Sequence, residues 1–329
     1  MTRLLWPGPG YCRRSLANSP SDSAATHSKS RELPSHLGAV GLALLVAFLW
    51  SSSWILIRWG LDRETLRPLG FAALRYGLAS VALLTWVAIR PDFRRSLRLI
   101  DRGVAIQILT LGVIFYAVTQ GAQFVAIDNQ PAATTSLVLS FTPLVVSMLA
   151  GRSLDETVSA RQVTGAILVL GGAALYFSGQ LGATLVGMTA AVVGLAANVS
   201  SSLLGRRVNR AAALPAVVIT ALSMACGALL LVVVALATEH LPSISLRAWL
   251  IIGWLALVNT AVAFTLWNLS LRRLTAVESS GINNTMLVQI ALLAWVFLGE
   301  SPGWLGWSGV LLVSMGVFLT QTATGNPRS

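Results

Sequence analysis

Ten apolar runs of about twenty residues each dominate the sequence and restrict what it can fold into. A helix rises 1.5 Å per residue, so a run of this length crosses the roughly 30 Å hydrocarbon core of a bilayer. Only 11% of the 329 residues are charged, against about 25% in a soluble domain. We therefore predict an all-α membrane protein whose ten transmembrane helices span residues 37–57, 68–89, 103–124, 131–150, 160–178, 182–204, 214–236, 247–269, 276–298 and 302–321.

The arginines between these runs indicate an orientation. With the N-terminus inside, the cytosolic loops hold twelve arginines and the opposite loops hold four, as the positive-inside rule favours. The cytosolic set is Arg90, Arg94, Arg95, Arg98, Arg102, Arg152, Arg161, Arg206, Arg207, Arg210, Arg272 and Arg273, and the opposite set is Arg58, Arg63, Arg67 and Arg247. We expect a multi-pass protein of the plasma membrane, in bacteria the inner membrane, with both termini in the cytosol.

The two ends of the chain lie outside the apolar runs. Residues 1–36 are rich in Ser, Pro and Arg and contain no apolar segment of the kind that a signal peptide needs. We interpret them as a disordered cytosolic tail, with a transit peptide as the alternative. Residues 322–329 form a short C-terminal cytosolic tail.

Charge and composition exclude several classes of partner. The net charge of +11 comes from short basic clusters between apolar runs, so no soluble basic domain exists to hold a nucleic acid. The two cysteines, Cys12 and Cys226, and three histidines outside the spans give no metal or cofactor site. The expected partners are membrane lipid and a small-molecule solute, and we leave a homodimer open.

The sequence contains an internal repeat with a shift of 144 residues. This shift lays Glu156 on Glu300, Gly165 on Gly309 and Gly172 on Gly316. Residues 37–178 then form a first five-helix repeat and residues 182–321 a second, although the first two spans of each half align poorly. Five is an odd number, so the second copy is inserted upside down, and inverted repeats are typical of transporters that work by alternating access.

Several phrases resemble a known family. "AIDNQPAATTSLVLSFTPLVVSMLAGRSLDE" (126–156), "NTAVAFTLWNLSLRRLTAVESSG" (259–281), "FLGE" (297–300) and "FAALRYG" (71–77) resemble EamA-type permeases of the drug/metabolite transporter superfamily. The resemblance covers residues 37–321 but departs in "RSLDE", where "FLGE" is usual, and in Leu287, which stands opposite Pro143. It implies a ten-helix permease for small solutes, in a family whose substrates range over amino acids, metabolites, nucleotide-sugar-like molecules and drugs.

Polar residues on helix faces mark the expected solute path. Tyr116, Gln120 and Gln123 share one face of the third span, and polar faces should point into the bundle. On the fourth span Ser136, Ser140, Pro143 and Ser147 do the same, and the repeat shift adds Thr260, Phe264, Trp267, Ser280, Asn284 and Leu287. Nearby lie Asn259, Asn268, Asn283 and Gln289, with Trp50 and Trp54 as an aromatic wall. The alternative for these polar residues is hydrogen bonding and close packing between helices.

Arg75 lies about 10 Å inside the second span, where a lone charge costs about 2.5 to 3.5 kcal/mol. We predict that it faces the cavity and holds a carboxylate or phosphate, with snorkelling to the outer interface as the alternative. No acid lies comparably deep, because Asp128 and Glu278 are near span ends. A zwitterionic or anionic solute is therefore favoured over a quaternary cation. Glu156 and Glu300 are expected to terminate helices at tight turns, with a gating role as the alternative, and Pro143 is assigned to the same helix-turn or gating group.

These observations favour a secondary transporter that exports a small, amino-acid-like metabolite. The alternatives within transport are an importer or an exchanger of the nucleotide-sugar or drug type. A membrane-embedded enzyme is the alternative from another class, but the spans contain no histidine, no paired deep carboxylates and no HExxH motif.

The orientation predicts which loops a reagent outside the cell can reach. In a variant without Cys12 and Cys226, a cysteine at Arg95 should stay unlabelled by a membrane-impermeant thiol reagent in intact cells. A cysteine at Arg63, in an opposite loop, should be labelled under the same conditions. If only the cysteine at position 95 were labelled, the predicted orientation would be wrong and the opposite one would hold.

Overall fold

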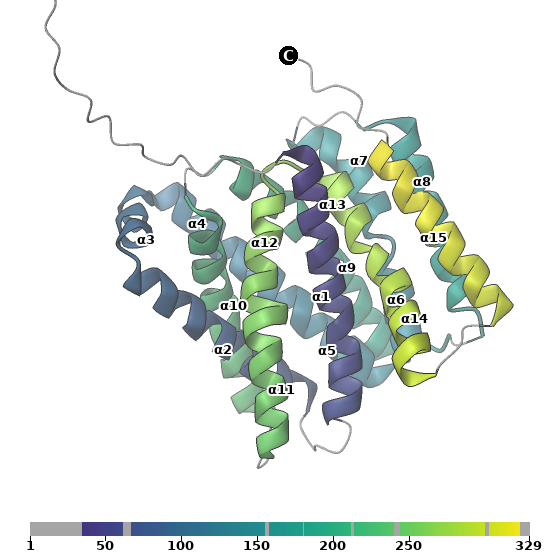
Figure 1. Ribbon diagram of the computed structural model, residues 1–329, viewed down its shortest axis with the longest axis horizontal. Coiled ribbons are helices and arrows are strands. Elements are labelled where there is room, and N and C mark those ends of the chain that lie inside the picture. Colours follow the sequence, from purple (N-terminus) through teal and green to yellow (C-terminus); the bar gives the residue numbers. More distant parts are fainter. Residues whose placement is uncertain are drawn as a thin grey trace, which may run out of the picture. The chain divides into compact units, whose positions relative to one another are not determined.

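The computed structural model describes residues 35–61, 67–154, 158–179, 181–211, 214–239, 244–299 and 303–322. All regular structure in these ranges is helical (Figure 1). The predicted N-terminal tail up to residue 34, the C-terminal tail from residue 323, Glu156 and Glu300 lie outside the described residues, as does the side chain of Trp54.

A helix or an interrupted helix covers each of the ten predicted spans. The first repeat contains α1 (His36–Leu61), α2 (Pro68–Ile89), α4 (Arg102–Gly112), η2 (Val113–Thr119), α5 (Gln120–Asn129), α6 (Ala132–Leu139), α7 (Thr142–Leu154) and α8 (Ala160–Tyr176), with the short α3 (Pro91–Ser96) and η1 (Leu97–Leu99) after α2. The second contains α9 (Leu185–Ala211), α10 (Ala216–Thr238), α11 (Leu246–Ala256), η3 (Leu257–Val262), α12 (Ala263–Ser270), α13 (Ala276–Asn283), α14 (Thr285–Leu298) and α15 (Trp304–Thr322).

Nine of these spans, within the described residues, are long and apolar enough to cross a membrane. The remaining one, α8, has only 17 residues and packs lengthwise against α15. The prediction of an all-α membrane protein is therefore confirmed.

Local sequence signals set several helix ends. Asp101 and Ser245 cap α4 and α11 by accepting hydrogen bonds from backbone amides of the first turn. Thr275 forms a reciprocal capping box with Glu278 at the start of α13. Gly299 ends α14 with φ of 70°, a left-handed conformation that suits glycine.

The repeat is visible in the positions of the helices. The starts of α4 and α11, η2 and η3, α6 and α13, and α8 and α15 are each separated by 144 residues. The starts of α2 and α10 are 148 apart, and those of α1 and α9 are 149 apart. The connections near the start of each repeat therefore differ in length, which explains why the first two spans align poorly in sequence.

The two repeats interlock through their first helices. Helix α1 packs chiefly against α11, α12, α13 and α14 of the second repeat, while α9 packs mainly against α4 to α7 of the first. Helix α2 packs against α10, and Figure 1 shows α1 between helices of the second repeat. Neither repeat therefore buries its apolar surface by itself.

Helices α8 and α15 pack closely against each other through glycines. A Cβ atom on Gly165 would lie 2.6 Å from the carbonyl oxygen of Gly316, and one on Gly172 would lie 2.6 Å from that of Gly309. Residues early in α8 thus meet residues late in α15, so these two corresponding helices run antiparallel. The repeat shift maps each glycine pair onto the other, as a two-fold axis between the helices requires.

This contact predicts different effects for two neighbouring glycines. Gly172→Ala should lower the free energy of unfolding by about 1–3 kcal/mol, because its Cβ would overlap the α15 backbone. Gly171→Ala is the matched control, since its Cβ would lie 3.6 Å from Leu312, an ordinary contact, and alanine is the better helix former by about 1 kcal/mol. Thermal unfolding in detergent measures both, and equal melting temperatures would contradict the close packing.

Candidate functional site

Corresponding helices of the two repeats are interrupted at corresponding positions. The third span of each repeat contains a π-helical segment, η2 or η3, and the fourth is broken at Ser140 or Asn284. In η3, the Thr260 hydroxyl donates a hydrogen bond of 2.9 Å to the Leu255 carbonyl. Such irregular segments are frequent at functional sites, and discontinuous helices commonly form the binding sites of membrane transporters.

Arg75 of α2 points into the protein against η3 and α1. Its Nε donates a hydrogen bond of 2.7 Å to Thr260 Oγ1, and its Nη2 lies 3.3 Å from the carbonyl oxygen of Asn259 and 3.4 Å from Ser53 Oγ. The side chain is only 7% exposed, and its described partners are all neutral. The guanidinium therefore does not snorkel to the interface here, and its buried charge lacks a carboxylate among these partners.

Asn259 is fully buried beside this guanidinium. Its side-chain amide donates to the carbonyl of Leu49 and to the hydroxyls of Ser52 and Ser53, the last two at 3.1 Å. These bonds join η3 to α1 and leave the Oδ1 atom buried without a hydrogen-bond partner among the described residues. A buried acceptor without a partner costs about 1–3 kcal/mol, so such an atom requires an explanation.

Aromatic rings from α1, α2, η2 and α12 form a cluster near these polar residues. The ring of Trp50 lies 4.9 Å from Phe264 and 5.2 Å from Trp267, and Tyr116 lies 5.0 Å from Phe264. The Trp50 indole nitrogen is buried without a hydrogen-bond partner among the described residues, whereas the buried Tyr116 hydroxyl lies close to the side chains of Ser223 and Asn268. The cluster thus combines an apolar wall with one available donor.

The broken fourth span of the second repeat contacts α1. Gln289 accepts a hydrogen bond of 3.2 Å from Ser51 of α1 and donates one of 3.2 Å to Thr285. Asn284 stands at the break, where its side-chain nitrogen is buried and has no partner among the described residues, while Asn283 is partly buried. The Gln289 amide therefore connects α14 to α1, whereas the Asn284 amide has an unpaired donor.

Three predicted site residues lie apart from these hydrogen bonds. Gln120 and Gln123 occupy the first turn of α5, which packs mainly against α9, and both are partly buried. Neither side chain is seen in a hydrogen bond with another described residue. Pro143 is the second residue of α7, where its missing N–H lies in the first turn and breaks no helical bond.

The sequence did not indicate two features of the polar structure. Arg75 requires acceptors, but nothing in the sequence showed that Thr260 and Ser53 supply them. Glu278 lies near a span end, as expected, yet its side chain is completely buried. A position near a span end therefore did not predict an exposed side chain. The Thr275-x-x-Glu278 capping pattern was readable, but burial depends on α1 and α15, which are distant in sequence.

The fold and this interior define a class: a multi-pass membrane protein built from two copies of one unit, with polar groups gathered where the copies meet. The model of the EamA-like transporter family matches residues 37–178 and 185–322. The chain belongs to this family, within the drug/metabolite transporter superfamily, and is a transporter rather than an enzyme.

Named relatives and a solved structure agree with this assignment. The chain is 25% identical to a "Probable amino-acid metabolite efflux pump" of Salmonella typhimurium, covering 84% of this chain and 93% of the relative. It is 27% identical to an "S-adenosylmethionine/S-adenosylhomocysteine transporter" of Chlamydia trachomatis (80% and 84% covered) and 29% identical to a "Probable terminal-alkyne amino-acid exporter" of Streptantibioticus cattleyicolor (84% and 93%). A crystal structure with 18% identity shares the fold with a TM-score of 0.74, over 89% of this chain and 100% of that one.

The environment of Arg75 predicts opposite effects on stability for two substitutions. Arg75→Met should leave the melting temperature equal or higher, because it removes a buried charge whose described partners are neutral. Thr260→Val should lower the free energy of unfolding by about 1–3 kcal/mol, because it leaves the guanidinium Nε unpaired. Thermal unfolding in detergent measures both, and a large loss in Arg75→Met would show that the arginine is mainly structural.

Proposed function

We propose that this protein is a secondary transporter of the plasma membrane that exports an amino-acid-like solute by alternating access, with both termini in the cytosol. The observation that carries the proposal is the buried guanidinium of Arg75, whose described partners are neutral, together with the side-chain Oδ1 atom of Asn259, which is buried and has no hydrogen-bond partner among the described residues. These two groups have the opposite polarity needed for the two ends of a zwitterion.

Each end of an α-amino acid has a matching group in this site. The guanidinium of Arg75 presents several N–H donors in one plane, an arrangement that suits a carboxylate. The Asn259 Oδ1 atom is an acceptor only, which suits an ammonium group. The Trp50 and Phe264 rings, 4.9 Å apart, offer an apolar surface for a side chain.

The names of the relatives support this class of solute. They mention an amino-acid metabolite, S-adenosylmethionine with S-adenosylhomocysteine, and a terminal-alkyne amino acid. Molecules of these kinds share an α-amino acid end and differ in the remainder. A site that holds the common end would account for one scaffold serving such different solutes.

The position of the site between the repeats supports alternating access. Arg75 and Ser53 belong to the first repeat, while Asn259 and Thr260 belong to the second. A solute that replaces Thr260 and Asn259 as partner of the guanidinium would weaken a tie between the two halves. Binding and the movement of the repeats would then be linked.

Solute exchange in proteoliposomes tests the role of Arg75. A thermal-shift screen of amino acids, S-adenosylmethionine, organic acids and nucleotides identifies a solute, and its flux is then measured. Arg75→Gln should reduce flux of an amino-acid solute at low concentration by about 10-fold or more, since a hydrogen bond to a charged group contributes about 1.5–3 kcal/mol. Arg75→Lys should recover part of it.

The control is Arg95→Gln, which removes an exposed arginine and should leave flux unchanged. Unchanged flux in Arg75→Gln would contradict the assignment of the carboxylate site. Stabilisation by nucleotides alone would favour the exchanger alternative over an amino-acid exporter.

A further inference from the structure

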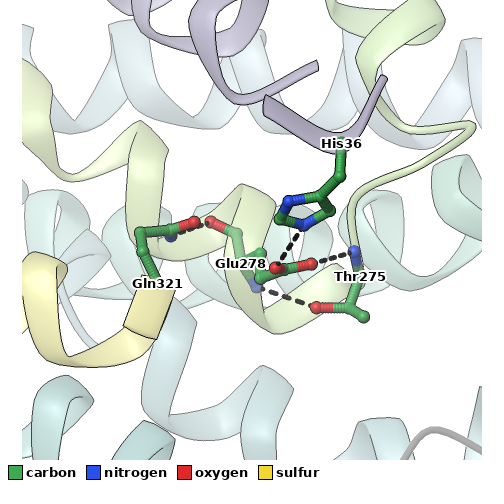
Figure 2. Close-up of polar contacts among 4 residues, drawn as sticks. All are labelled: His36, Thr275, Glu278 and Gln321. Carbon is green, nitrogen blue, oxygen red and sulfur yellow. Dashed lines mark hydrogen bonds and ion pairs between the residues drawn. The ribbon is translucent and has the colours of Figure 1, made fainter. Parts of the chain in front are cut away.

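A contact between a histidine and a glutamate joins the two repeats where α1 begins and α15 ends. His36, the first residue of α1, lies with its Nε2 atom 2.9 Å from Oε1 of Glu278 in α13 (Figure 2). The Glu278 side chain is fully buried, whereas the His36 side chain is 50% exposed. A buried carboxylate is therefore in contact with a titratable ring that solvent can reach.

The protein holds Glu278 in a fixed position. Its Oε2 atom accepts a hydrogen bond of 2.7 Å from the backbone N–H of Thr275, and its own N–H donates to the Thr275 hydroxyl at 3.2 Å. Its backbone carbonyl accepts a bond of 3.0 Å from Gln321 of α15 (Figure 2). The carboxylate also lies in the first turn of α13, where the helix dipole stabilises negative charge. These contacts hold the Glu278 carboxylate in place against the ring of His36.

The other charged groups of the elements packed on α13 are arginines. Helices α14 and α15 contain no titratable side chain in their described lengths, and α7 contributes Arg152, whose side chain lies outside the described residues. At the end of α9, Arg206 is buried and donates to the carbonyl of Leu271, while Arg207 and Arg210 are exposed. Before α13, Arg272 donates to the carbonyl of Leu214 and Arg273 is exposed. Arginine keeps its charge at all ordinary pH values, so these groups do not titrate with His36.

The opposite end of the bundle has a neutral contact in the corresponding place. The repeat shift of 144 lays Glu278 on Thr134 of α6. The Thr134 hydroxyl donates a bond of 2.6 Å to the carbonyl of Gly182, just before α9, and accepts one of 3.1 Å from the Gly182 N–H. Since α9 corresponds to α1, both contacts tie the start of a fourth span to the start of a first span. Of these two contacts, only the Glu278 contact contains titratable groups.

We propose that His36 and Glu278 form a proton-binding site that sets how firmly α1 of the first repeat is held against α13 of the second. In the neutral ring, the Nε2–H donates to the Glu278 carboxylate. A proton from solution adds to Nδ1, the ring becomes a cation, and the hydrogen bond becomes an ion pair. Histidine ordinarily changes charge between about pH 5 and 8, so the tie strengthens as the pH at this end falls.

The consequence for transport rests on the proposed alternating access. In alternating access, one repeat moves against the other, and such a movement can separate α1 of the first repeat from α13 of the second. The protonated His36–Glu278 pair opposes this separation. In the proposed orientation this end faces the cytosol, so cytosolic acid slows the opening of that side.

Thermal unfolding across pH tests the proton site without any solute. The full-length protein in nanodiscs is melted from pH 5.5 to 8.5 as wild type, His36→Gln and Glu278→Gln. The melting temperature of the wild type relative to His36→Gln should be about 2 °C higher at pH 5.5 than at pH 8.5, where only the neutral hydrogen bond remains. Glu278→Gln keeps the capping pattern, since glutamine also serves at this position, and should lose the same pH-dependent part. A wild-type to His36→Gln difference that is constant across pH would overturn the proton site.

Thr134→Val is the matched control, because it breaks the corresponding neutral contact. It should lower the melting temperature equally at every pH. With the solute found above, wild-type flux should fall as pH falls from 8 to 6, whereas flux in His36→Gln should change less than 2-fold and Thr134→Val should keep the wild-type profile. A pH-dependent melting difference with identical flux profiles in wild type and His36→Gln would overturn the link to transport.

Discussion

A bilayer offers no water to the peptide backbone, so every N–H and C=O within it needs a partner inside the protein. This requirement makes the spans helical, and it makes each interruption of a helix expensive. The interruptions in this protein fall at η2, η3, Ser140 and Asn284, in the third and fourth spans of both repeats. Hydroxyl groups repair part of the loss, as Thr260 does at the Leu255 carbonyl. Two buried side-chain atoms without a partner among the described residues, Asn259 Oδ1 in η3 and the amide nitrogen of Asn284, also lie at these interruptions.

The positions of the spans were predictable because length and hydropathy alone determine which segments can cross a membrane. The inverted repeat was predictable because two Gly pairs and one Glu pair share a single shift. The breaks at Ser140 and Asn284 were not predicted, because hydropathy continues through them without change. Contacts between helices were equally hidden: nothing local to Arg75 reveals that Thr260, 185 residues away, would accept its hydrogen bond.

The repeats share a scaffold but not its chemistry. The shift of 148 between α2 and α10 lays Arg75 on Ser223, and the shift of 144 lays Glu278 on Thr134. In both cases one copy carries a charged side chain and the other a hydroxyl. Duplication thus supplies two copies of one helical scaffold, and substitution at a few buried positions makes the two copies chemically different.

The interlocking of the first helices also constrains how the chain is made. Helix α1 is synthesised first, but its main packing partners, α11 to α14, are synthesised more than 180 residues later. Until those helices have been synthesised, the small and polar residues of α1, Ser51 and Ser53 among them, lack their packing partners in the second repeat. Domains usually fold as units during synthesis, but this arrangement allows the first repeat only a partial structure. Assembly is completed when the end of the chain has entered the membrane.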